Sequence, residues 1–226
     1  MNTNFKSLAH VLGFAGALLC TALPSTAAVA VYTSQAAYQV ALGTSFASDS
    51  FSDLTPGSAL TGPLSRLAGS TVYRASAVPL VSDLGAEDFF PIAPGGNTAL
   101  SSNFSDASMV FDQFSQSVRG LSGHFFSTDE QGDLLTGSLS LVLIDQDGSF
   151  NYSLATGAAP SFLGFISNGS FSGLSLSAVQ PAGGFKFAAV DDLGLSVTSP
   201  VPEASAASLS LLGLGLMLLA VKRRRS

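Results

Sequence analysis

Short stretches in which apolar and polar residues alternate recur through the middle of the chain, and glycine, serine or proline bounds each of them. They lie at residues 70–75, 108–111, 118–126, 138–145, 149–154, 162–166, 171–178 and 185–198. A period of two residues puts one face of a β-strand against a core, and turn-forming residues every 8 to 12 residues or so are typical of sandwiches and barrels. The pattern therefore predicts an all-β fold.

The clearest local element is a hairpin around Asp147-Gly148. Apolar residues alternate at positions 139–143 before this pair and at 150–154 after it. Asp-Gly supplies the positive φ angles of a tight primed turn. Because Val142 and Ile144 are apolar too, we expect the first strand of this hairpin to be buried on both faces.

One segment has a helical pattern instead. Residues 36–42 are mostly good helix formers, preceded by the hydroxyl residues Thr33 and Ser34 and followed by Gly43. A hydroxyl cap and a closing glycine indicate one short N-terminal helix.

The first thirty residues have the pattern of a secretory signal peptide. Lys6 is followed by a largely apolar run at residues 11–23, and a series of small residues ends at Ala30. Signal peptidase removes such segments, whereas a permanent anchor needs about 20 apolar residues. We expect residues 1–30 to be removed by a cut after Ala30. A cut after Ala28 and a retained anchor are the alternatives.

The chain contains a single cysteine, Cys20, which lies inside this signal segment. The residue before it is Leu19 rather than a small residue, so we do not expect a lipoprotein. The exported protein then has no disulfide and no thiolate metal site.

A second apolar segment lies near the C-terminus. Residues 204–221 are uncharged and rich in leucine, and a helix of this length spans about 27 Å, close to the hydrocarbon thickness of a bilayer. It is followed directly by the basic residues Lys222, Arg223, Arg224 and Arg225. Because basic residues beside a span stay in the cytoplasm, we expect a transmembrane helix at 204–221, a cytoplasmic tail at 222–226 and an exported domain at 31–200.

The sequence Val201, Pro202 and Glu203, followed by the leucine-rich segment and the arginine cluster, resembles the PEP-CTERM sorting tag of Gram-negative bacteria. The usual motif is Pro-Glu-Pro, and Ala204 occupies its third position here. The resemblance implies that an exosortase, a membrane cysteine protease-transpeptidase, cleaves the tag at residues 201–226. It also implies that the protein is held in the inner membrane before processing and then works at the cell surface, in exopolysaccharide or in biofilm matrix. A simple tail anchor is the alternative.

The middle of the chain also resembles the ectodomain common in PEP-CTERM proteins, at residues 33–38, 51–54 and 187–193. This resemblance implies a fold similar to carbohydrate-binding modules. The full expectation is a jelly-roll-like antiparallel β-sandwich with one short N-terminal helix, plus the C-terminal transmembrane helix.

The exported segment 31–200 is acidic. It contains four basic and fourteen acidic residues, which gives a net charge of −10. Nucleic-acid binding needs a basic surface, so we expect no nucleic-acid partner. The acidity favours solubility and can attract divalent cations.

Few residues suggest chemistry. His124 is the single histidine of the exported segment, and no Gly-x-Ser-x-Gly motif is present, so we expect no catalytic residues and no enzyme. Asp129, Glu130 and Asp133 fall within five residues. Carboxylates are ligands that calcium prefers, so these three are the candidate site of a structural calcium ion, with a solvated loop as the alternative. We expect no other cofactor.

We therefore expect a non-enzymatic β-sandwich associated with carbohydrate or exopolysaccharide. A structural stalk without a ligand is one alternative. Another is a secreted glycoside hydrolase, which needs two carboxylates about 5–10 Å apart. Its acid pair would come from Asp129, Glu130, Asp133, Asp191 and Asp192.

Overall fold

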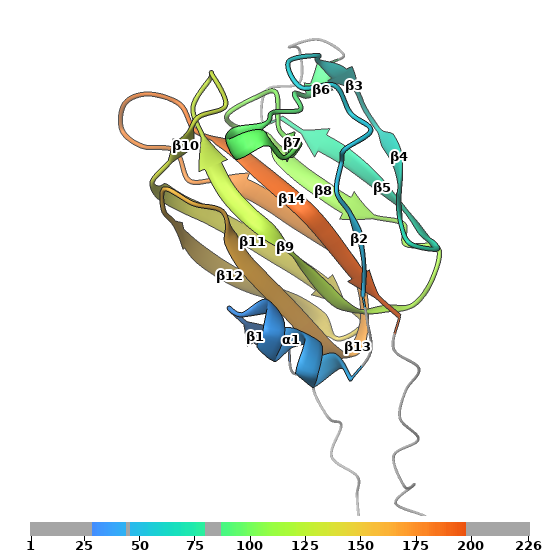
Figure 1. The fold of residues 1–226 in the computed structure, drawn as a ribbon. Coiled ribbons are helices and arrows are strands. Elements are labelled where there is room, and N and C mark those ends of the chain that lie inside the picture. Colours follow the sequence, from blue (N-terminus) through green and yellow to red (C-terminus); the bar gives the residue numbers. More distant parts are fainter. Residues whose placement is uncertain (1–28, 44–45, 80–86, 198–226) are drawn as a thin grey trace, which may run out of the picture.

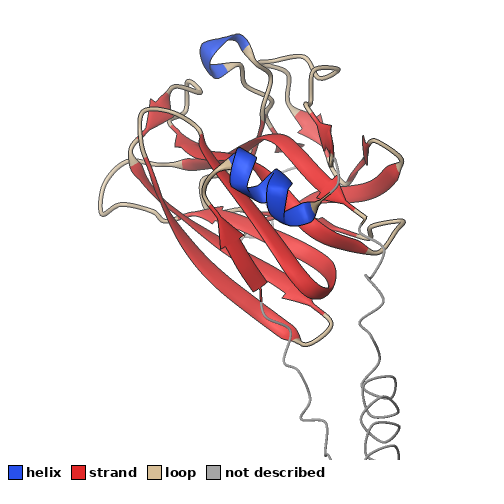
Figure 2. Cartoon of the chain, turned by 60° about the horizontal axis from the view of Figure 1, so that its bottom comes forward, coloured by secondary structure: helices blue, strands red, loops and turns tan. Residues whose placement is uncertain are grey.

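Antiparallel β-strands make up most of the described residues (Figures 1 and 2). The computed structural model describes residues 29–43, 46–79 and 87–197. Its strands are β1 (Val29–Tyr32), β2 (Ala47–Asp49), β3 (Leu60–Thr61), β4 (Leu64–Ala68), β5 (Thr71–Val78), β6 (Glu87–Phe89), β7 (Leu100–Ser101), β8 (Ser108–Asp112), β9 (Val118–Thr128), β10 (Leu134–Leu135), β11 (Gly137–Asp145), β12 (Gly148–Thr156), β13 (Ser161–Ala178) and β14 (Phe187–Ser196). The helical elements are α1 (Gln35–Leu42) and the 3-10 turn η1 (Pro94–Gly96). The predicted all-β fold with a short N-terminal helix is confirmed.

The long strand β13 belongs to both layers of a sandwich. Up to Ser167 it pairs with β9 on one side and β1 on the other, and from Phe171 onward it pairs with β11 and β8. One layer is therefore β1-β13-β9-β14-β2 and the other is β12-β11-β13-β8-β5-β4. The rings of Phe165 and Tyr152, one from each layer, meet edge to face with their centroids 5.8 Å apart. The hydrophobic core thus lies between the two layers.

Strand β11 is buried on one face only, so the prediction of two buried faces was wrong. Leu139, Leu141 and Leu143 lie in the core, whereas Val142 is half-buried and Ile144 is 46% exposed. The physical reason is the position of β11, whose outer face is not covered by a third layer. Its second apolar set therefore remains partly in contact with water.

The β11–β12 hairpin forms where the sequence places it, but its turn is built differently. Asp145 pairs with Gly148, so the two turn residues are Gln146 and Asp147. Neither of them has a positive φ angle. Instead, Oδ1 of Asp145 accepts hydrogen bonds from the backbone N–H groups of Asp147 and Gly148 at 2.9 and 3.1 Å. A side-chain acceptor therefore shapes the turn in place of the predicted Asp-Gly geometry.

Helix α1 packs on glycines of the sheet. Its Tyr38 is fully buried, and a Cβ atom built on Gly164 of β13 would overlap the Tyr38 ring. Ser34 occupies the N-cap position without a side-chain cap hydrogen bond, and Gly43 ends the helix with φ of 66°. The predicted helix boundaries are confirmed, and the missing side chain at position 164 lets the helix approach the sheet closely.

The Arg66 cluster, which we define as Arg66, Asp49, Asp53 and Tyr73, joins β2, β4 and β5. The Arg66 guanidinium donates two hydrogen bonds to the Asp49 carboxylate and two to the Asp53 carboxylate, at 2.7–2.9 Å. The Tyr73 hydroxyl donates to Asp49 at 2.7 Å. Burial, and then the Asp49 charge, raise the pKa of Tyr73, so this hydroxyl remains a donor. The hydrogen bonds from Arg66 lower the pKa of Asp53.

The first and last described strands reach the same end of the sandwich. β9 and β14 run side by side from the pair Thr128–Phe187 at one end to the pair Gly120–Ser196 at the other. Ile166 pairs with both Gly120 and Ala30, so β1 begins at the end where β14 finishes. Figure 1 shows β1 and the end of β14 at the bottom of the view.

The sorting motif of Val201, Pro202 and Glu203, the expected span at 204–221 and the basic tail at 222–226 lie outside the described residues. Within the described residues, no helix is long and apolar enough to cross a membrane. Ala30, the predicted last residue of the signal peptide, lies inside β1.

Candidate functional site

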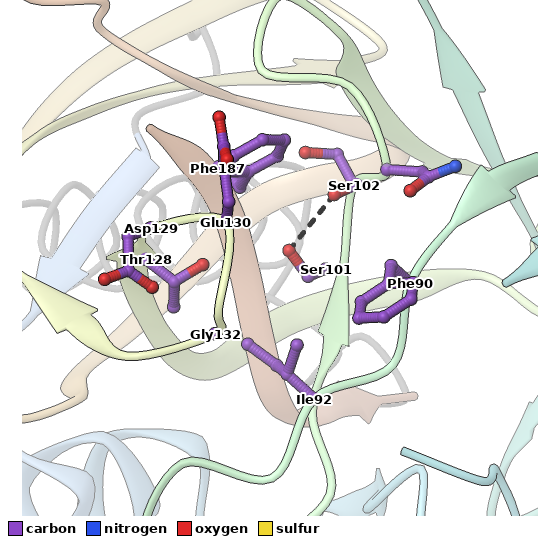
Figure 3. Close-up of a pocket in the computed structure, with 10 residues that line it drawn as sticks. Phe90, Ile92, Ser101, Ser102, Thr128, Asp129, Glu130, Gly132 and Phe187 are labelled. Carbon is purple, nitrogen blue, oxygen red and sulfur yellow. Dashed lines mark hydrogen bonds between the residues drawn. The ribbon is translucent and has the colours of Figure 1, made fainter. Parts of the chain in front are cut away.

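A pocket of about 230 Å³ (Figure 3) opens at the end of the sandwich where β14 begins, opposite the end where β14 finishes. It is lined by Phe90, Ile92, Ser101, Ser102, Asn103, Thr128, Asp129, Glu130, Gly132 and Phe187. This volume lies below the roughly 300–1,000 Å³ of pockets that hold drug-sized ligands. The pocket therefore suits one ring-sized group.

Segments far apart in the sequence meet at this pocket. Phe187, the first residue of β14, pairs with Thr128 at the end of β9. The Phe90 N–H donates to the Ser101 carbonyl at 3.0 Å, and the Ser102 N–H donates to the carbonyl of residue 188 at 3.1 Å. Backbone hydrogen bonds of the sheet thus fix the positions of the lining side chains.

The turn between β9 and β10 closes one side of the pocket and is held by Asp129. Its Oδ1 accepts hydrogen bonds from the backbone N–H groups of Gln131 and Asp133 at 3.0 and 2.9 Å. Gly132 follows with φ of 85°, and a Cβ atom built on it would lie 3.0 Å from the Ile92 side chain. This left-handed position favours glycine and brings the turn close to the opposite wall.

The structure does not bring the three predicted calcium ligands together. Among the described residues, no group of three histidine, cysteine or acidic side chains is arranged to hold a metal ion. Asp129 uses one carboxylate oxygen to brace its own turn, and Asp129 and Glu130 line the pocket while Asp133 does not. The acidic turn is therefore a wall of the pocket.

Two buried hydroxyl groups beside the pocket have no hydrogen-bond partner among the described residues. They are Oγ of Ser102 and Oγ1 of Thr128, on residues that are 2% and 1% exposed. Their neighbour Ser101 differs, because its hydroxyl donates to backbone carbonyls of residues 102 and 188. A buried hydroxyl without a partner costs about 1–3 kcal/mol. Figure 3 shows these side chains facing the space between the acidic turn and β7.

Apolar rings and acidic side chains line the same space. The rings of Phe90 and Phe187 contribute apolar surface, and the carboxylates of Asp129 and Glu130 are hydrogen-bond acceptors. The side-chain amide of Asn103 donates to the Glu87 carbonyl at 2.9 Å, which holds it in place. Such a pocket can hold a ring that has both an apolar face and hydroxyl groups.

His124 and the pair Asp191-Asp192 lie elsewhere along the sheet. Asp191 pairs with His124, four residues from the Phe187–Thr128 pair that lines the pocket, which is about 13 Å along the strands. Nδ1 of His124 is 3.7 Å from Asp192, and its ring meets Phe162 edge to face. Burial, followed by the Asp192 charge, raises the pKa of Asp191.

Four of the five acids considered for a hydrolase are therefore divided between two hollows, and Asp133 lines neither of them. Asp129 and Glu130 line the pocket described above. Asp191 and Asp192 line a separate hollow of about 240 Å³ with Ser50 and other residues. An acid pair drawn from both places does not share one cleft.

Sequence reasoning identified Asp129 and Glu130 but missed the rest of the pocket. Phe90, Ser102, Thr128 and Phe187 have no local pattern that marks them, because their proximity depends on strand pairing over long distances. The one available signal was the density of phenylalanines near the acidic turn and at the start of the last strand.

Comparisons with known proteins give weak likenesses. No family model and no curated protein matches the chain. A variant of a family 29 carbohydrate-binding module solved with cellulohexaose is similar at 14% identity and a TM-score of 0.36, covering 63% of this chain and 92% of that one. Another family 29 module has the same identity and TM-score and covers 63% and 89%.

A third similar structure contains the CBM22-1 and GH10 modules of a Clostridium thermocellum xylanase, solved with xylohexaose. It is 10% identical with a TM-score of 0.32 and covers 58% of this chain and 27% of that one. TM-scores of this size do not establish a shared topology, so the function follows from the chemistry of this chain's own pocket.

Proposed function

We propose that this chain is a non-enzymatic carbohydrate-binding β-sandwich of the cell surface or extracellular matrix. The observation that carries the proposal is the pair of buried, unpartnered hydroxyls of Ser102 and Thr128 beside a pocket walled by Phe90 and Phe187. A sugar ring offers an apolar face to an aromatic side chain and hydroxyls to polar groups. It therefore matches both kinds of surface in this pocket.

Sugar hydroxyls would satisfy groups that the folded protein leaves unpaired. They can accept from or donate to Ser102 and Thr128, and they can donate to the carboxylates of Asp129 and Glu130. A buried hydroxyl without a hydrogen-bond partner raises the free energy of the unbound protein. When a ligand pairs with that hydroxyl this cost is removed, and binding is stronger as a result.

We further propose that residues 201–226 are a PEP-CTERM tag processed by an exosortase, and that the fold is of the jelly-roll type. The register of β14 supports a surface role, because the pocket residue Phe187 starts this strand and Ser196 ends it. The pocket thus opens at the end opposite the exit toward the tag.

Carbohydrate binding is tested with a variant that is expected to raise thermal stability and to weaken glycan binding. Thr128→Val removes the unpaired hydroxyl at nearly constant volume, so we expect higher thermal stability together with weaker binding to a glycan panel. Ser196→Ala is the matched control, because the Ser196 hydroxyl is also buried and unpartnered but lies at the far end of β14. It is expected to stabilise the protein without changing binding. Equal glycan binding by wild type and Thr128→Val contradicts the proposed site.

Sorting is tested by the intact mass of the protein recovered from cells and medium, with and without Pro202→Ala and Glu203→Ala. Loss of residues beyond the motif in the wild type, and their retention in the double variant, supports exosortase processing. Retention of Lys222 to Ser226 in both proteins indicates a simple tail anchor.

A further inference from the structure

A second hollow continues the pocket along the surface. It has a volume of about 650 Å³ and shares Asn103 and Phe187 with the first pocket. Its lining also includes Phe104 and Phe185, and Phe185 is 61% exposed. Because Asn103 and Phe187 line both hollows, the two adjoin, and we call them together the groove.

The second hollow is braced by one side chain. Nε2 of Gln180 donates to the carbonyls of Ser105 and Lys186 at 2.6 and 2.8 Å, and its Oε1 accepts from the Lys186 N–H at 3.1 Å. Gln180 thus ties the loop after β13 to the loop before β8. A groove whose walls are tied together before binding loses less conformational entropy when it takes a ligand.

The charges along the groove have one sign. Asp129 and Glu130 line the first pocket and Asp106 lines the second, while no arginine, lysine or histidine of the described residues lines either. An anionic ligand would meet like charge here, and a neutral or cationic one would not.

The basic side chains of the described residues are engaged elsewhere. Both arginines of β4 and β5 are paired with carboxylates. Arg119 donates to the Gly169 carbonyl, and Lys186, which lies between Phe185 and Phe187 in sequence, donates to the Thr136 carbonyl. None of these cations is directed at the groove.

We infer that the groove binds a stretch of several neutral or amino sugars within a polysaccharide, and that it discriminates against chains of uronic acids. This inference rests on the proposed carbohydrate function. The two adjoining hollows, of about 230 and 650 Å³, offer room for more than one sugar ring, and the carboxylates of the groove set the charge preference.

The test of length compares monosaccharides with the matching hexasaccharides by calorimetry, using the full chain purified in detergent. Phe185→Ala is expected to weaken hexasaccharide binding by about tenfold, as expected for truncation of an aromatic anchor, and to leave monosaccharide binding unchanged. Val40→Ala, which removes exposed apolar surface on α1, is the control and should change neither. Equal affinity for one sugar and six overturns the extended site.

The test of charge compares neutral glycans with their uronic counterparts: cello-oligosaccharides with oligoglucuronate, galactan with polygalacturonate, and mannan with polymannuronate. Glucosamine oligomers serve as the cationic probe. We expect each acidic polymer to bind at least about fivefold more weakly than its neutral partner, since each like-charge contact costs up to about 1 kcal/mol. Added salt and Glu130→Gln should both reduce this difference. Equal or tighter binding of the uronates overturns the charge preference.

Different results would reject the proposed carbohydrate binding and the further inference about chain length and charge. Binding that is sensitive to Thr128→Val but independent of chain length and charge retains the carbohydrate site and rejects the further inference. The absence of binding to every neutral and cationic probe rejects both.

Discussion

Removal of the Arg66 guanidinium should destabilise the protein far more than removal of the exposed Asp53 charge beside it. The Arg66 and Asp49 side chains are only 10% and 5% exposed, whereas Asp53 is 67% exposed. Breaking a buried ion pair by removing one partner costs about 3–5 kcal/mol, because the other charge remains buried. An exposed pair contributes about 0–1 kcal/mol.

Two further sets of contacts change the loss of stability that is expected for Arg66→Met. Asp49 keeps the Tyr73 hydroxyl and the Phe51 N–H as donors, which reduces the loss. The guanidinium also lies 5.3 Å from the centroid of the Phe51 ring, a contact worth about 0.5–1 kcal/mol. We therefore expect Arg66→Met to lower the free energy of unfolding by about 3 kcal/mol and Asp53→Asn by less than about 1 kcal/mol.

Urea unfolding followed by tyrosine fluorescence measures both changes, since the chain has four tyrosines and no tryptophan. The double variant Arg66→Met/Asp49→Asn is the decisive control. It removes the buried charge that Arg66→Met leaves behind, so it should be more stable than Arg66→Met alone. Equal losses for Arg66→Met and Asp53→Asn, or a double variant that is less stable still, would refute the reasoning.

Three further outcomes follow from particular contacts. Gly164→Ala should destabilise the protein by about 1–3 kcal/mol, as overpacking does, because its methyl group overlaps the buried tyrosine of α1; Gly157→Ala, which meets open space, is the control in the same urea titration. Asp191→Asn should raise the melting temperature at pH 7. Burial raises the pKa of Asp191, so its contribution to the free energy of unfolding is complete below the unfolded pKa of about 3.9 and is lost as pH rises through the folded pKa. Asparagine carries no charge at any of these pH values, so a variant whose stability depends on pH as strongly as that of the wild type would contradict this. N-terminal sequencing of the exported protein should begin at Val29, because β1 uses both Val29 and Ala30 in pairing with β13; a start after Ala30 would contradict it.

Elements that depend on neighbours in the sequence could be predicted, and those that depend on pairing at a distance could not. The alternating leucines of β11 indicate a strand, and Gly43 at the end of α1 indicates a helix terminus. Both signals are local, so this strand and this helix were predicted correctly. The hairpin turn differs from the prediction because Gln146 and Asp147 form it, while Gly148, with φ of 142°, already belongs to β12. The Asp145 carboxylate accepts hydrogen bonds from the backbone of this turn.

The pocket also depends on strand pairing at a distance, so its residues could not be predicted from the local sequence. Thr128 looks like an ordinary strand residue, and its unpaired hydroxyl follows only from the arrangement of β7, β9 and β14 around it. The charge of Asp129 suggests a calcium ligand from the sequence, and the structure adds that its carboxylate accepts two hydrogen bonds from its own turn. Composition thus indicates the acidic wall of the pocket, whereas these hydrogen bonds depend on the folded turn.

Strand β14 links the pocket to the proposed attachment of the chain. Phe187 at its start is a wall of the pocket, and Ser196 at its end pairs with Gly120 at the opposite end of the sandwich. A strand of 10 residues is about 30 Å long at roughly 3.3 Å per residue, so a membrane tag that follows Val197 would leave the pocket on the far side of the domain. Because β1 begins at the same end, the described chain enters and leaves the sandwich at the end opposite the groove. A polysaccharide could then be bound by a domain still attached to the membrane, and binding would not depend on whether the tag has been cleaved.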